Sequence, residues 1–73
     1  MSVKQVVRAG ARSRLVMFDE EKPVRFDYVG GMWRACSEDL PRFLARANWA
    51  GDYQEAMLRL HAELPPESQS WTQ

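Results

Sequence analysis

Cys36 and His61 are the residues whose side chains most often carry covalent or acid–base catalysis. A nucleophile needs a base beside it and a third group that orients the base. His61 is the single histidine and lies in a segment with helical periodicity, whereas Cys36 is the last residue of a strand-like segment. A lone cysteine is more often a small buried apolar residue than a nucleophile. We therefore predict that the chain is not an enzyme.

Metal and cofactor sites are equally unsupported by the residue types and their spacing. Structural zinc needs four cysteine or histidine ligands, and the chain contains two such residues. Asp19-Glu20-Glu21 and Glu38-Asp39 lack the spacing of a calcium loop, and Gly30-Gly31 forms no phosphate-binding motif. We expect no metal and no cofactor.

The composition is that of one small folded domain. The chain has 73 residues, 45% of them hydrophobic, and ten basic residues balance ten acidic ones, which excludes a generally polyanion-binding protein. A single cysteine, no leader-like segment and no long apolar run predict a cytoplasmic protein without membrane contact.

The first half of the chain has the pattern of strands. Leu15–Phe18 is a short apolar run that ends in an acidic turn before Pro23. Val24, Phe26 and Tyr28 alternate with polar residues, and Gly30-Gly31 fits a hairpin turn into a further strand at residues 32–36. These segments predict an antiparallel sheet.

The second half changes to helical periodicity. Asp52 and Glu55 have the spacing of a capping box, and Pro65-Pro66 ends the segment. The residues predicted to share its apolar face are Tyr53, Ala56, Met57, Leu60 and Leu64.

Residues 41–49 fit two structures. Phe43, Leu44 and Ala47 could form one face of a short helix after Pro41, or Phe43–Ala47 could be a third strand. We therefore predict an α+β fold, a small antiparallel sheet of about three strands covered by one carboxy-terminal helix, with a second short helix as the alternative. The predicted divisions are a basic arm or weak edge strand at 1–14, one α+β domain at 15–64 and a Pro/Ser/Gln-rich tail at 65–73.

Large side chains exceed what so small a core can bury, and aromatic residues are enriched in protein interfaces. The candidate partner-binding residues are Tyr28, Trp33, Arg34, Trp49 and Trp71, and for Trp33 the alternative is burial in the core. A second interpretation is nucleic-acid binding, with Tyr28, Trp33 and Arg34 as a stacking platform on one exposed sheet face. The basic residues that would contact phosphates are Lys4, Arg8, Arg12 and Arg14.

The run from Phe26 to Pro41, with Gly30-Gly31 and Asp39-Leu40-Pro41, followed by Gly51–Leu60, resembles the HicB-like antitoxin domain. The resemblance covers roughly residues 24–64. It departs from the family pattern at Arg42, where a glycine is expected, at Tyr53, where a threonine is expected, and in about four extra residues before Asp52. The resemblance implies a partial ribonuclease-H-like fold, a third strand after Pro41, a dimer and no catalytic residues.

The resemblance also implies a function. We expect a noncatalytic protein that binds and inhibits a protein partner such as a small ribonuclease toxin. The alternatives are a phage or mobile-element inhibitor of a host enzyme complex and the nucleic-acid binder described above. A homodimer is expected, paired through exposed strand edges at Leu15–Phe18 and Phe43–Ala47.

Overall fold

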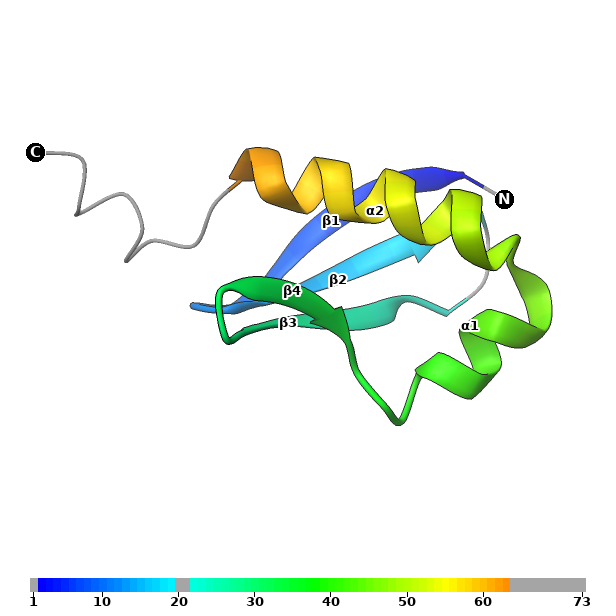
Figure 1. Ribbon diagram of the computed structural model, residues 1–73, viewed down its shortest axis with the longest axis horizontal. Coiled ribbons are helices and arrows are strands. Elements are labelled where there is room, and N and C mark those ends of the chain that lie inside the picture. The colour runs from blue at the N-terminus through cyan, green and yellow to red at the C-terminus, as the bar shows by residue number, and fades with distance from the viewer. Residues whose placement is uncertain (1, 20–21, 64–73) are drawn as a thin grey trace, which may run out of the picture.

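The computed structural model describes residues 2–19 and 22–63 as one sheet with two helices (Figure 1). The strands are β1 (Val3–Gly10), β2 (Ser13–Phe18), β3 (Val24–Val29) and β4 (Met32–Ala35), and the helices are α1 (Leu40–Arg46) and α2 (Trp49–Glu63). The four strands lie in the order β1-β2-β3-β4, each antiparallel to the next. The α+β fold with a carboxy-terminal helix packed on the sheet is confirmed. In the described ranges, neither helix is long and apolar enough to cross a membrane.

The segment predicted as an arm or a weak edge strand is the outermost strand of the sheet. Val3 pairs with Phe18 and Val7 with Leu15, so β1 runs along most of β2. Val3 is buried, whereas most of the other residues of β1 are exposed. The sheet therefore has one strand more than the sequence pattern predicts.

Alternation along the strands separates a covered face from an open face. In β2 and β3 the buried side chains include Val16, Phe18, Val24 and Phe26, all on the face that α2 crosses. Leu60 of α2 is completely buried with them. A sheet that is covered on a single face requires this alternation of buried and exposed side chains along each strand.

Residues 40–46 form α1, so the third strand expected after Pro41 is wrong. Proline is favoured in the first helical turn, and Leu40, Phe43 and Ala47 then point to the core at helical spacing. Arg42 fixes the helix in place because its guanidinium donates to the carbonyls of Lys22 and Pro23, at 2.8 and 2.7 Å. The arginine that departs from the HicB-like pattern therefore ties α1 to the start of β3.

The predicted capping box is also wrong, because α2 begins three residues before Asp52. The buried Asp52 carboxylate accepts a hydrogen bond from the amide of Asn48 at 2.8 Å. Glu55 does not reach back within its helix but accepts a hydrogen bond from the amide of Val3 at 3.3 Å. Both carboxylates thus fix the ends of elements. Leu64, predicted on the same face, lies outside the described residues.

The predicted hairpin turn is present between β3 and β4. Val29 pairs with Met32, and Gly30 and Gly31 have φ angles of 62° and 85°. Residues with a Cβ rarely adopt these angles, which explains the glycine pair.

The strand edges expected to form a homodimer are not edges. β2 is paired on both sides, with β1 and β3, and residues 43–46 belong to α1. The edges of the sheet are β1 and β4.

The packing of α2 on the sheet predicts that Leu60→Ala lowers the free energy of unfolding by about 2–5 kcal/mol. Leu58 is the matched control, because it lies in the same helix with 65% of its surface exposed. Leu58→Ala should change stability by no more than about 0.5 kcal/mol. Urea unfolding followed by circular dichroism measures both, and equal effects would contradict the packing described here.

Candidate protein-binding surface

Five aromatic rings form a continuous cluster that joins the sheet to both helices. Phe18 contacts Phe43 with ring centroids 4.7 Å apart, and Phe43 contacts Trp49 at 5.6 Å. Trp49 contacts Tyr53 at 4.5 Å, and Tyr53 contacts Phe26 at 5.5 Å. Tilted and edge-on contacts at these distances are favourable for aromatic pairs. We call these five residues the aromatic cluster.

Trp49 is where the aromatic cluster reaches the surface. It is the first residue of α2, and 42% of its surface is exposed, whereas Phe18, Phe26 and Phe43 are buried. Its ring is nevertheless fixed, because Phe43 and Tyr53 contact it. We call Trp49 together with the half-buried Tyr53 the Trp49 surface. The partner-binding residue Trp49 of the sequence prediction is therefore placed where a partner could contact it.

Leu44 is a second exposed apolar residue of the helical segment, with 42% of its surface accessible. The sequence pattern grouped Leu44 with Phe43 and Ala47 on one inward face. In α1 the inward residues are Leu40, Phe43 and Ala47, so Leu44 is turned aside. Leu40, Phe43 and Ala47 are spaced by three and then four residues, and this helical spacing could have shown that Leu40 rather than Leu44 faces the core.

Trp33 belongs to the core, so its prediction as an exposed partner-binding residue is wrong. It is 1% exposed and makes an edge-on contact with Tyr28 at 5.1 Å. Its indole N–H has no hydrogen-bond partner in the described structure. Tyr28 is half-buried beside it on the covered face. Both rings therefore serve the packing of the sheet.

Arg14 is also buried, at 3% exposure, and its predicted role in contacting phosphates is wrong. Its guanidinium donates to the carboxylate of Glu63 and to the carbonyls of Gly10 and Ser13. It also lies over the Trp33 ring, 5.3 Å from the centroid. Through these contacts, the Arg14 guanidinium joins α2 to the turn between β1 and β2.

The face of the sheet away from α2 has no stacking platform. Trp33 and Tyr28 lie on the covered face, whereas Arg34 lies beside Asp27 on the open face. Among the described residues, every aromatic side chain belongs to the covered face or to a helix. The stacking platform predicted from sequence is therefore wrong.

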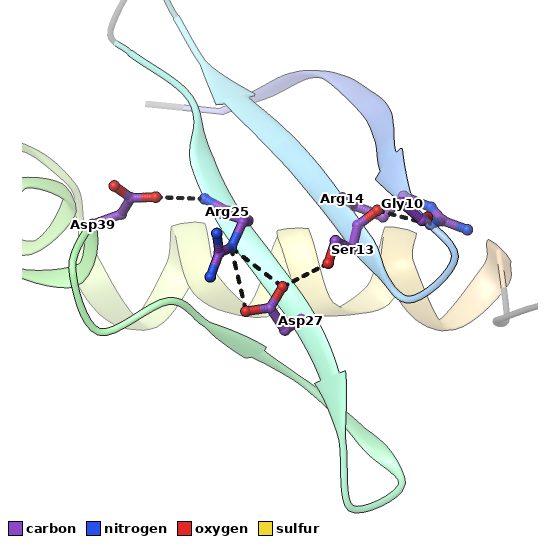
Figure 2. A network of polar contacts seen from close by, with 6 residues as sticks. All are labelled: Gly10, Ser13, Arg14, Arg25, Asp27 and Asp39. Carbon is purple, nitrogen blue, oxygen red and sulfur yellow. Dashed lines mark hydrogen bonds and ion pairs between the residues drawn. The ribbon is translucent and has the colours of Figure 1, made fainter.

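A polar network occupies part of this open face (Figure 2). Ser13 donates to Asp27 at 2.8 Å, and the Arg25 guanidinium lies 3.3 Å from the same carboxylate. The negative charge of Asp27 raises the pKa of Arg25 above its ordinary value. The backbone amide of Arg25 donates to Asp39 at 3.0 Å. The network thus connects β2, β3 and the start of α1.

Cys36 and His61 have different surroundings. Cys36 is half-buried in the connection after β4, where its amide donates to the carbonyl of Arg25 at 2.6 Å. His61 is exposed on α2. Within residues 2–19 and 22–63, no group of three histidine, cysteine, aspartate or glutamate side chains is arranged to hold a metal ion.

Lys4, Arg8 and Arg12 are exposed at β1 and its turn, as the nucleic-acid interpretation requires of them. The predicted partner-binding residue Trp71 lies outside the described residues.

Comparison of the chain with family models, curated proteins and solved structures finds no match in any of the three. The assignment of a surface therefore depends on the contacts described above.

The contacts of Arg14 predict that Arg14→Ala destabilises the fold by about 2–4 kcal/mol, because it removes a cation–π contact and several buried hydrogen bonds. Arg8 lies directly opposite on β1 but is exposed, so Arg8→Ala is the control. Its effect should stay within about 0.5 kcal/mol. Chemical denaturation measures both, and a tolerated Arg14→Ala would refute the structural role.

Cys36 and His61 are expected to be dispensable for the activity of the protein. Cys36→Ser and His61→Ala should each retain the cellular effect of the protein, because in the described residues no hydrogen bond joins the Cys36 thiol to the His61 imidazole as a nucleophile–base pair. Growth or inhibition assays with folded variants measure this effect. Loss of the effect in a variant with normal thermal stability would contradict the noncatalytic prediction.

Proposed function

We propose that the chain is a noncatalytic module that binds a protein partner, with the Trp49 surface at the centre of the contact. The observation that carries this proposal is the combination of exposure and rigidity at Trp49. The indole is 42% exposed although Phe43 and Tyr53 fix its position. A partner that covers a rigid aromatic residue pays little conformational entropy.

The expected gain from covering Trp49 is that of a hot-spot residue. Burying the exposed part of the indole removes on the order of 80 Å² of apolar surface from water, or about 2 kcal/mol. Tryptophan is among the residues that most often dominate binding energy when truncated to alanine. One such residue can therefore dominate the affinity of a small interface.

The HicB-like resemblance supports a finer version of this proposal. Residues 26–41 and 51–60, which carry the resemblance, include β4 and most of α2, and they contribute Phe26 and Tyr53 to the aromatic cluster. A HicB-like module would bind and inhibit a small ribonuclease toxin. An inhibitor of a host enzyme would use the same surface for a different partner.

Nucleic-acid binding receives less support from the geometry. Arg14 is engaged with Glu63, and the aromatic residues that would stack on bases are turned to the covered face. Stacking platforms need exposed rings beside a basic groove.

The proposal predicts that Trp49→Ala reduces affinity for the native partner by at least about tenfold, the usual effect of removing a hot spot. Leu58→Ala is the matched control, since Leu58 is an exposed apolar residue of the same helix. The tagged wild type, Trp49→Ala and Leu58→Ala proteins are used to capture partners from the source cell. The affinity of each of the three for the captured partner is then measured by calorimetry.

Thermal unfolding of each variant separates lost binding from lost folding. Trp49→Phe keeps an aromatic ring beside Phe43 and Tyr53, so it should retain part of the affinity. Equal binding by the wild type and folded Trp49→Ala would refute the Trp49 surface. Inhibition of a captured ribonuclease in a titration would support the toxin version, and a captured nonribonuclease would contradict it.

A further inference from the structure

In the described residues, no further strand pairs with the outer edge of β1. β1 is the outermost strand of the sheet, drawn in blue in Figure 2. It contains eight residues, most of them exposed. β4, at the other edge, has four residues. The backbone amides and carbonyls that point outward from an edge strand can pair with another extended chain. β1 is thus the longer of the two pairing surfaces.

The charges along β1 are all positive. Lys4 and Arg8 are its charged residues, both exposed, and no acidic residue occurs between positions 2 and 18. Among the described residues neither side chain makes an ion pair. They differ in this from Arg14, whose charge is satisfied by Glu63. Lys4 and Arg8 therefore remain available to a partner.

A second copy of this chain is a poor match for the edge. In the register with a twofold axis at Val6, antiparallel pairing of two β1 strands places Lys4 opposite Arg8 of the second copy, twice. Like charges directly opposite each other destabilise a strand pair, and charged edge residues are a common protection against self-pairing. The charges of the edge therefore disfavour a homodimer paired in this register.

We propose that β1 is a docking edge for an extended acidic segment of another protein, which adds to the sheet as a fifth strand. Backbone pairing would supply the affinity, and carboxylates opposite Lys4 and Arg8 would select the partner. The Glu55 carboxylate occupies the amide of Val3, so the acidic segment fits the stretch from Lys4 to Gly10. This inference uses none of the residues of the Trp49 surface and stands independently of it.

A charge-reversed copy of the chain is the probe, because Lys4→Glu with Arg8→Glu turns β1 into an acidic strand of known sequence. Mixed with the wild type, it places Glu opposite Lys4 and Arg8. We expect each protein alone to be monomeric at hundreds of micromolar in low salt, and the mixture to form a 1:1 heterodimer by sedimentation equilibrium. The heterodimer should weaken as salt is added.

The control is a chain with Lys22→Glu and Arg59→Glu, which has the same net charge but an unchanged β1. It should not pair with the wild type. Hydrogen exchange adds a readout that general electrostatic attraction does not change, since those amides of residues 4–10 that point away from β2 should exchange at least tenfold more slowly in the heterodimer. If the double variant does not fold, Arg8→Glu alone serves as the probe and should give a weaker complex.

Three results would overturn the proposal. The first is a mixture that remains monomeric, and the second is a wild-type homodimer with protected β1 amides. The third is binding of a single-stranded oligonucleotide through Lys4 and Arg8 without heterodimer formation, which would assign the basic edge to nucleic acid. A heterodimer with protected β1 amides would support β1 as a docking edge, whatever the effect of Trp49→Ala on the binding of other partners.

Discussion

The structure depends on the burial of one face of a four-stranded sheet beneath α2. A chain of 73 residues buries only about 60% of its unfolded surface, so its core is thin. Val16 and Phe26 from the sheet and Leu60 from the helix are completely inaccessible to water. The short α1 closes one end of this layer through Phe43. With the helices on one side, the other face of the sheet is open.

This one-sided packing decides which aromatic residues are available for recognition. Trp33 and Phe26 fill the covered face, and Trp49 reaches the surface because it begins α2 at the edge of the core. The aromatic cluster connects the exposed indole to Phe18 and Phe26 through direct ring contacts. A partner bound to Trp49 would therefore contact a residue that is already part of the folded core, which is the arrangement that gives a rigid binding anchor.

The packing also divides the basic residues into two groups. Arg14 and Arg42 are structural, because one joins α2 to the β1–β2 turn and the other joins α1 to the start of β3. Lys4 and Arg8 are exposed on β1, the edge strand of the sheet. The neutral net charge of the chain hides this local difference.

The sequence alone determined the features that depend on local periodicity and backbone conformation. The alternation at Val24–Tyr28, the glycine pair of the hairpin and the apolar spacing from Tyr53 to Leu60 predicted two strands, a turn and the covering helix, since each pattern arises within a few residues. Tertiary structure decided the rest. Residues 41–49 fit a strand or a helix by pattern, and the family resemblance favoured the strand. The core contacts of Phe43 and the hydrogen bonds from Arg42 to the carbonyls of Lys22 and Pro23 stabilise the helix instead. Likewise, Arg14 and Lys4 look alike in the sequence, but the folded structure buries Arg14 between the Trp33 ring and Glu63, 49 residues away, and leaves Lys4 exposed. Long-range pairing of this kind has no signature in local sequence, because it depends on which elements the folded core brings together.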